Sequence, residues 1–274
     1  MSRRFAGFAS LVLPIVAAAE PLPSVASINL CADQLVLRLA DPEQILSVSW
    51  LATDAEESMF AEHARRYPVN YGSAEEILHL APDVVIAGVF TNTFTRQLLR
   101  DLGFAVVDVA PAASIAQIET NVRQVATALR QEHRGERIVR EMREHVVALE
   151  KARPTQVRAA VVVRPGGFTV GAQTLADELL RLAGLSNVAA DNGLDRWGSL
   201  SMETLLSSRP SLLIYAGYRR GEHSLANLVL EHPALERLAE RIPTTTVAAK
   251  YWACELPESL HSADQLQRTV RAVP

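Results

Sequence analysis

The strongest constraint on the fold is an internal repeat at an offset of 128 residues. Residues 73–86 and 201–214 share five identities in fourteen aligned positions, where unrelated segments share about one. Each copy has the pattern of a helix, a proline that stops the helix, and a buried strand. Glu75 and Glu203 occupy the same position in the two copies. The repeat predicts two related α/β units, and the alternative is two ordinary helix-strand units that agree by chance.

Short apolar runs alternate with segments of helical periodicity on both sides of the middle of the chain. Strands that alternate with helices form parallel sheets, so the predicted fold class is α/β with two parallel-sheet lobes. In the first half we expect strands over 25–30, 45–50, 83–88 and 105–109, and helices beginning near Cys31 and over 75–80 and 95–102. In the second half we expect strands over 157–163, 211–216 and 245–249, and helices over 175–182 and 258–270.

The segment between the two lobes has the composition of a long helix. Residues 114–151 contain no proline and one glycine, and their apolar residues recur at helical spacing. We expect one long α-helix here, with Gly135 as the place for any break. The expected organisation is an N-terminal lobe over 20–112, a bridging long helix over 113–153 and a C-terminal lobe over 154–274.

The N-terminus has the pattern of a secretory signal peptide. Two arginines precede an apolar run over residues 5–16, and residues 17–19 are alanines. The run is shorter than the ~20 apolar residues that span a bilayer. We therefore expect cleavage of residues 1–19 and a mature chain that begins at Glu20, free in the periplasm. The alternative is a buried first helix.

Composition and charge exclude several classes of protein. The chain is 49% hydrophobic and 21% charged, which is typical of a globular protein with a real core. Its net charge of -4, without a block of basic residues, argues against nucleic acid as a partner. Cys31 and Cys254 are the only cysteines in the sequence, so it permits one disulfide at most and no four-cysteine zinc site.

The sequence lacks the common motifs of enzymatic chemistry. It contains no nucleophile elbow, no phosphate-binding P-loop, no His-Glu-x-x-His and no Cys-x-x-Cys. We expect its histidines to be solvated surface residues that do not converge on a metal, and we expect no cofactor. The histidines are His63, His79, His133, His145, His223, His232 and His261.

The order of four segments along the chain is typical of one protein family. The segments are residues 28–33, 73–86, 184–188 and 197–203. In this order the chain resembles the periplasmic binding proteins of ABC importers for vitamin B12 and iron-siderophore complexes, known as class III. The resemblance covers nearly all of the expected mature chain. It implies two α/β lobes bridged by one long α-helix, with ligand held in the cleft between them.

By this resemblance the chain is not an enzyme but a monomeric carrier. It would capture a small-molecule metal chelate, cobalamin or another corrinoid or a ferric siderophore, and deliver it to an ABC permease dimer in the inner membrane. Two alternatives stay open: an enzyme or metal-cofactor assembly protein on the same two-lobe fold, and a ligand-sensing subunit of a periplasmic signalling receptor.

Aromatic residues gather at the expected strand ends, where clefts between α/β lobes are lined. This placement favours a large, flat, partly apolar ligand. Arg164 and Arg219 are candidate cations for an anionic chelate, although solvation at the surface is the alternative for Arg219. About half of the aromatic residues are expected to be structural. The candidates are Trp50, Tyr71, Phe90, Phe168, Trp197, Tyr215, Tyr218, Tyr251 and Trp252, of which Trp197 and Trp252 best match aromatic positions of the vitamin B12 binders.

The resemblance also assigns roles to two residue pairs. Glu75 and Glu203 would lie one on each lobe and engage arginines on the two halves of the permease, the alternative being a favourable interaction with each helix dipole. Family topology places Cys31 and Cys254 on opposite walls of the cleft, which implies a disulfide across it. Two buried thiols are the alternative.

Overall fold

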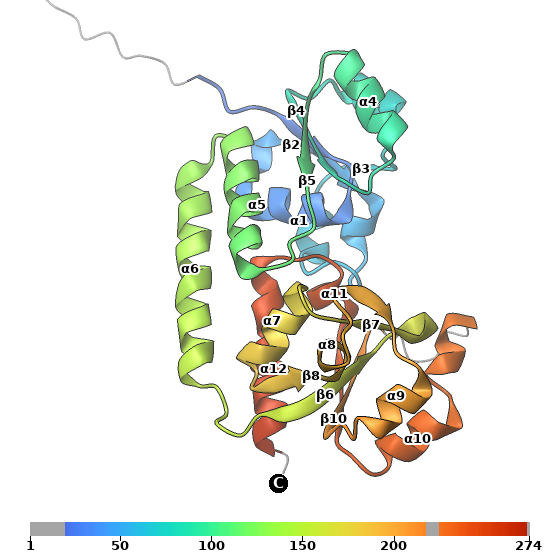
Figure 1. The fold of residues 1–274 in the computed structure, drawn as a ribbon. Helices are drawn as coiled ribbons and strands as arrows, with labels where there is room; N and C mark the ends of the chain where they lie inside the picture. Colours follow the sequence, from blue (N-terminus) through green and yellow to red (C-terminus); the bar gives the residue numbers. More distant parts are fainter. Residues whose placement is uncertain (1–19, 218–224, 273–274) are drawn as a thin grey trace, which may run out of the picture.

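The computed structural model describes residues 20–217 and 225–272. Its elements form two α/β lobes, one above the other in Figure 1, and helix α6 (Glu132–Lys151) runs alongside both. The signal peptide expected over residues 1–19 and the candidate ligand residues Tyr218 and Arg219 lie outside the described residues.

A five-stranded parallel sheet forms the centre of the N-terminal lobe, in the order β3-β2-β1-β4-β5. Strand β4 is buried along its whole length. Val84 and Ile86 face one apolar cluster, and Val85 and Ala87 face another, so both sides of the strand are covered. The strands are β1 (Val25–Ser27), β2 (Ile45–Ser49), β3 (Val69–Asn70), β4 (Val84–Gly88) and β5 (Ala105–Val109).

The C-terminal lobe contains a four-stranded parallel sheet in the order β11-β10-β6-β8, beside a small antiparallel pair of β7 and β9. The apolar residues of β6 and β10 alternate between two clusters in the same way. The strands are β6 (Arg158–Val163), β7 (Phe168–Val170), β8 (Leu185–Asn187), β9 (Trp197–Ser199), β10 (Leu212–Ala216) and β11 (Thr244–Val247). The expected α/β class with two parallel-sheet lobes is confirmed.

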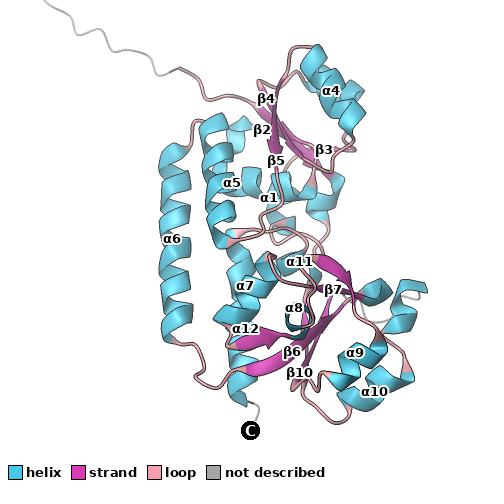
Figure 2. Ribbon diagram, viewed as in Figure 1, coloured by secondary structure: helices cyan, strands magenta, loops and turns pink. Residues whose placement is uncertain are grey.

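Helices cover both sheets (Figure 2). In the first half of the chain they are α1 (Leu30–Leu39), α2 (Ala61–Ala64), α3 (Ala74–Leu80), α4 (Thr93–Asp101) and α5 (Ile115–Ala128). In the second half, after α6, they are α7 (Leu175–Leu182), α8 (Val188–Asp191), α9 (Met202–Ser207), α10 (Pro233–Ala239), α11 (Ala249–Trp252) and α12 (Leu260–Ala272).

The sequence repeat has a structural counterpart in α3-β4 and α9-β10. Ser73 and Ser201 cap the two helices, each accepting a hydrogen bond from the backbone N–H three residues later. The residue before each proline, Ala81 or Arg209, has a left-handed backbone, with φ of 46° and 48°. The two strands that follow start and end at the same offset and are flanked on both sides in their sheets.

The segment expected to be one long helix consists of two helices. α5 ends at Ala128, the chain turns over residues 129–131, and α6 returns beside α5 (Figure 1). Arg130 makes this turn with a φ of 55°, so the break does not lie at Gly135. Gly135 lies inside α6, where a Cβ would come 2.6 Å from the Cβ of Ala126. The glycine therefore serves the close packing of two helices and does not end one.

Helix α6 bridges the two lobes. Near its start, Arg134 donates a hydrogen bond to the Leu39 carbonyl at 2.6 Å and pairs with Asp41 at 2.5 Å, both in the N-terminal lobe. Near its end, the Leu149 carbonyl accepts a hydrogen bond of 2.8 Å from Gln267 of α12. One apolar cluster includes residues of α1, α5, α6, α7 and α12, so the two lobes share a continuous core.

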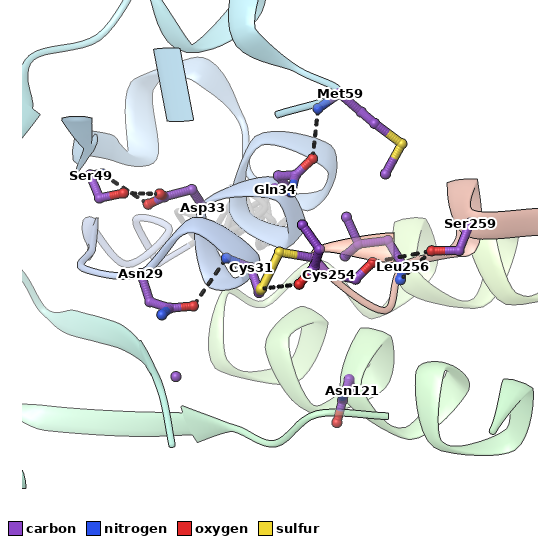
Figure 3. The surroundings of a disulfide bond; sticks show 12 residues. Asn29, Cys31, Asp33, Gln34, Ser49, Met59, Asn121, Cys254, Leu256 and Ser259 are labelled. Carbon is purple, nitrogen blue, oxygen red and sulfur yellow. Dashed lines mark hydrogen bonds between the residues drawn. A yellow bond between two sulfur atoms is a disulfide. The ribbon is translucent and has the colours of Figure 1, made fainter. Parts of the chain in front are cut away.

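A disulfide between Cys31 and Cys254 also joins the lobes (Figure 3). Cys31 lies in the first turn of α1, where its N–H donates to the capping side chain of Asn29 at 3.0 Å. Cys254 follows α11 and is fully buried. The two Cα atoms lie 5.2 Å apart and are separated by 223 residues in sequence. The bond therefore ties the segment after α11 to the N-terminal lobe.

A buried aspartate in each lobe fastens a helix to the end of a strand of the parallel sheet. Asp33 of α1 accepts hydrogen bonds from the backbone N–H of Ser49, at 2.9 Å, and from its hydroxyl, at the end of β2. Asp177 of α7 accepts from the Asn187 amide at 3.1 Å, at the end of β8. Asp177 also pairs with Arg181 at 2.8 Å. Burial raises the pKa of Asp33 to about 6, and the bonds from Ser49 act in the opposite direction.

We predict that replacing both cysteines by serine lowers the free energy of unfolding by about 5 kcal/mol, the chain-entropy value for so long a loop. Denaturant unfolding of the oxidised wild type and the double variant measures the difference. A reducing agent should destabilise the wild type to the same extent and leave the double variant unchanged. Two free thiols in denatured, unreduced wild-type protein would contradict the disulfide.

Asp33 should make stability depend on pH. Because its folded pKa lies above the usual value near 4, its contribution is fully present below pH 4 and is lost as the pH rises through 6. The wild type should therefore gain about 3 kcal/mol relative to Asp33→Asn between pH 7 and pH 4. Chemical unfolding of both proteins across this range measures the gain. A difference that is constant with pH, or that shrinks in acid, would show that Asp33 is not protonated in the folded state.

Candidate ligand-binding cleft

The carboxyl ends of the two parallel sheets meet at one cavity. Phe90 and Pro111 follow β4 and β5 of the N-terminal lobe, and Arg164 and Gly217 follow β6 and β10 of the C-terminal lobe. Ligands of open α/β sheets bind at this edge. The cavity has a volume of about 540 Å³, within the usual range of small-molecule sites. We call it the inter-lobe cleft; it is lined by Phe90, Pro111, Arg164, Pro165, Phe168, Trp197, Gly217, Trp252, Ala253 and Glu255.

A smaller cavity of about 110 Å³ continues the cleft toward the disulfide. It shares Phe90, Pro111, Ala253 and Glu255 with the cleft, and Cys31 lies in its wall. Figure 3 shows Asn29 and Asn121 near this end of α1. The side chain of Asn29 lies so close to Gly88 that a Cβ there would come 2.7 Å from the Asn29 Cγ. A side chain larger than glycine at the end of β4 would displace the cap of α1.

Arg164 and Trp197 form a stacked pair in the C-terminal wall of the cleft. The guanidinium carbon of Arg164 lies 5.1 Å from the centre of the Trp197 ring, within cation–π distance. Gly217 has a φ of 67°, a left-handed backbone that favours glycine. A Cβ there would only make ordinary van der Waals contact with the Arg164 Nη2, at 3.6 Å. Burial lowers the pKa of Arg164, whereas the negative charges of Glu255 and Glu57 raise it. The group keeps its charge and presents it at a partly desolvated surface beside an indole.

Glu255 is a cleft residue that the sequence analysis missed. Burial raises its pKa, which backbone hydrogen bonds and the positive charge of Arg164 partly offset. Trp252 and Cys254, which lie close to it in sequence, are both predicted functional residues. The sequence does not single out Glu255 itself, because nothing in it distinguishes this glutamate from a solvated one. The cleft therefore presents an acceptor near the Arg164 cation.

Three of the predicted aromatic residues line the cleft and are accessible: Phe90, Phe168 and Trp197. Phe90 is 85% exposed and comes from the N-terminal lobe, opposite the other two. Trp252 reaches the cleft with one edge but is only 7% exposed, and its indole N–H donates to the Ser262 hydroxyl at 2.8 Å. Trp252 is therefore largely a core residue that supports the cleft wall.

The other predicted aromatic residues do not line this cleft. Tyr251 packs against the core beneath Trp197 and Trp252. Tyr215 lies on β10 and packs into the cluster on the other side of the sheet, where it borders a different cavity. Trp50 and Tyr71 follow β2 and β3 and are exposed, but they border neither of the two connected cavities. Trp50 and Tyr71 directly follow their strands as expected, whereas Tyr215 lies within β10 and Tyr251 within α11.

Glu75 and Glu203 are exposed in the first turns of α3 and α9. Helix α3 starts four residues after Asn70 ends β3, so its N-terminus lies at the carboxyl edge of the N-terminal sheet. Helix α9 starts shortly after Trp197 and ends before β10 begins, which places its N-terminus at the corresponding edge of the other sheet. Both glutamates therefore lie on the side of their lobe that borders the cleft.

Comparison with known proteins identifies the family. Residues 25–239, most of the chain, match the family described as periplasmic binding protein. The cobalamin-binding protein of Halobacterium salinarum is 26% identical over 199 residues, which cover 69% of this chain and 53% of that protein. The vitamin B12-binding protein of Salmonella choleraesuis is 30% identical over 148 residues, 52% of this chain and 54% of that protein. The chain thus spans about half the length of these curated relatives.

Solved structures show the same fold. The periplasmic heme-binding protein HutB of Vibrio cholerae superposes with a TM-score of 0.76 at 20% identity, covering 90% of this chain and 98% of that one. None of the helices in the described residues is long and apolar enough to cross a membrane. The family and these relatives are binding proteins rather than enzymes. With a family match over most of its length, the chain belongs to the periplasmic binding protein family.

Proposed function

We propose that the chain is the substrate-binding component of an ABC importer and captures a corrinoid or ferric-siderophore-type chelate in the inter-lobe cleft. The observation that carries this proposal is the stacked Arg164–Trp197 pair in one wall, with the exposed ring of Phe90 in the other. A flat chelate can lie against an indole while a guanidinium pairs with its anionic groups. The relatives named for cobalamin and vitamin B12 support the same ligand class.

The proposal includes export to the periplasm. Cleavage after Ala19 would remove the segment with signal-peptide pattern and leave a monomer with lobes over 20–112 and 154–274, joined by residues 113–153. A disulfide fits this compartment, because such bonds persist in oxidising surroundings. We further propose that an inner-membrane permease dimer is the partner and that Glu75 and Glu203 dock to it. Their place beside the cleft means that one bound permease would cover both lobes and the ligand together.

Trp197 should contribute to ligand binding more than to stability. We predict that Trp197→Ala weakens binding of cyanocobalamin or ferric hydroxamate by about 1–3 kcal/mol, the usual value for an aromatic anchor. Titration followed by tryptophan fluorescence and by calorimetry measures the change. Trp50→Ala is the matched control, because Trp50 is 48% exposed, close to the 50% of Trp197, yet borders neither cavity. Unchanged affinity in Trp197→Ala would remove this residue from the binding site.

Unlike Trp197, Trp252 should contribute strongly to stability as well as to ligand binding. Its buried ring and its hydrogen bond to Ser262 predict that Trp252→Ala lowers the free energy of unfolding by about 3–5 kcal/mol in addition to weakening binding. Denaturant unfolding measures the first effect and titration the second. A variant of wild-type stability would mean that the indole is not the core anchor described above.

The docking proposal predicts a separation of uptake from binding. Glu75→Arg combined with Glu203→Arg should abolish ligand uptake by cells, because the charge reversal opposes arginines on the permease. Ligand affinity of the isolated variant should stay within about twofold of wild type, since neither glutamate lines the cleft. Radiolabelled uptake and titration of the same variant measure the two quantities.

A matched control reverses two charges at the opposite edges of the sheets. Glu43 and Glu240 are exposed and lie two and four residues before β2 and β11 in sequence, near the amino ends of these strands. Glu43→Arg with Glu240→Arg should transport normally. Wild-type uptake in the Glu75/Glu203 variant would refute docking while leaving ligand capture intact. Ligand binding without permease-dependent uptake in the wild type would instead favour the sensing subunit.

A further inference from the structure

Two histidines and an aspartate converge away from the cleft, where α6 packs against the start of α12. His145 comes from α6, and His261 and Asp264 come from α12. One ligand atom from each residue lies within 4.8 Å of the others. The expectation that no histidines converge is therefore wrong for this pair. Sequence could not show it, because 116 positions separate the two histidines and only the packing of two helices brings them together.

The spacing of these atoms suits a small metal ion. The His145 Nε2 lies 2.8 Å and the His261 Nδ1 3.6 Å from the same carboxylate oxygen of Asp264. Bonds of about 2.0–2.1 Å in a tetrahedral site place neighbouring ligand atoms about 3.3 Å apart. The two distances bracket this value, so small side-chain rotations would accommodate an ion. Asp264 follows His261 by three residues, which puts both on one face of the helix.

The scaffold that carries the three side chains is fixed by packing. Near the other end of the contact between α6 and α12, the buried Gln267 amide donates to the carbonyls of Leu149, at 2.8 Å, and Leu182, at 2.9 Å. His145 and His261 also lie close together, with ring centres 5.5 Å apart. An ion would therefore enter a site whose backbone is already in place, which reduces the entropy lost on binding.

The surrounding charges favour a cation. A cavity of about 170 Å³ beside the histidines is lined by Glu141 and Glu258 and by one cationic side chain, Arg38. Arg38 is paired with Glu258 at 3.1 Å and with Glu141 at 3.5 Å. Arg137 approaches Glu141 at 3.8 Å. Together with Asp264, the carboxylates outnumber these arginines when the imidazoles are neutral.

We propose that His145, His261 and Asp264 bind one divalent transition-metal ion of the zinc class, with water completing its coordination. Two imidazoles and a carboxylate are ligands that Zn²⁺ takes readily, whereas Mg²⁺ and Ca²⁺ prefer oxygen alone. The bound ion cross-links the bridging helix to α12. The His261 ring of α12 also lies 6.5 Å, centre to centre, from the ring of Tyr251 in α11, the helix that precedes Cys254 and Glu255. The site is separate from the inter-lobe cleft and takes a free ion rather than a chelate.

The test is a Zn²⁺ titration of the untagged, chelator-treated protein beginning at Glu20, with its disulfide intact. Calorimetry should detect one ion per chain, and Co²⁺ should give the visible absorption of a site with nitrogen ligands. His145→Ala and His261→Ala should each weaken Zn²⁺ binding by about tenfold or more. Zn²⁺ should raise the melting temperature of the wild type but not of these variants.

His133→Ala is the matched control, because His133 is exposed on the same helix α6 but lies outside the cluster. It should bind Zn²⁺ as the wild type does. Circular dichroism without metal checks that each variant is folded, and His145→Gln with His261→Gln replaces any alanine variant that is not. The proposal is overturned if the wild type binds no Zn²⁺, or if its affinity survives in folded variants at both histidines.

Discussion

The geometry of the cleft depends on how firmly the two lobes are held against each other. One apolar cluster runs through helices of both lobes, α6 contacts both, and the Cys31–Cys254 bond ties the segment after α11 to the start of α1. A continuous core resists rearrangement because it is close-packed. The two sheet edges that form the cleft are thus presented at a nearly fixed separation, so binding requires little ordering of the protein.

The two walls of the cleft differ in chemistry. The N-terminal lobe contributes Phe90 and Pro111, which offer apolar contact, whereas the C-terminal lobe contributes the Arg164–Trp197 pair and Glu255. Burial at this wall lowers the pKa of Arg164 and raises that of Glu255. In such a site charge pairing is stronger than at an open surface. Under the proposed function, the polar groups of the ligand would lie against the C-terminal wall and its apolar face against the opposite wall.

Sequence predicts the local part of this structure well. The repeat anticipated two α/β lobes. The expected strands over 83–88 and 105–109 and the helix over 175–182 agree with β4, β5 and α7 to within one residue, because buried strands and capped helices leave local signals. The turn at Arg130 was missed because no proline or glycine marks it, and Gly135, which is present, serves helix packing instead. Tyr215, Glu255 and the pairing of His145 with His261 depend on which way side chains face after the lobes assemble. That information is tertiary and has no local signature.

The most direct test of the central claim is a native mass spectrum of the protein purified from the periplasm with its ligand retained. We expect one flat metal chelate per oxidised chain, released on denaturation and lost when Arg164 is replaced by alanine. A retained sugar, amino acid or peptide would contradict the assignment of the cleft to a metal chelate. So would a chelate that remains fully bound in the Arg164→Ala protein.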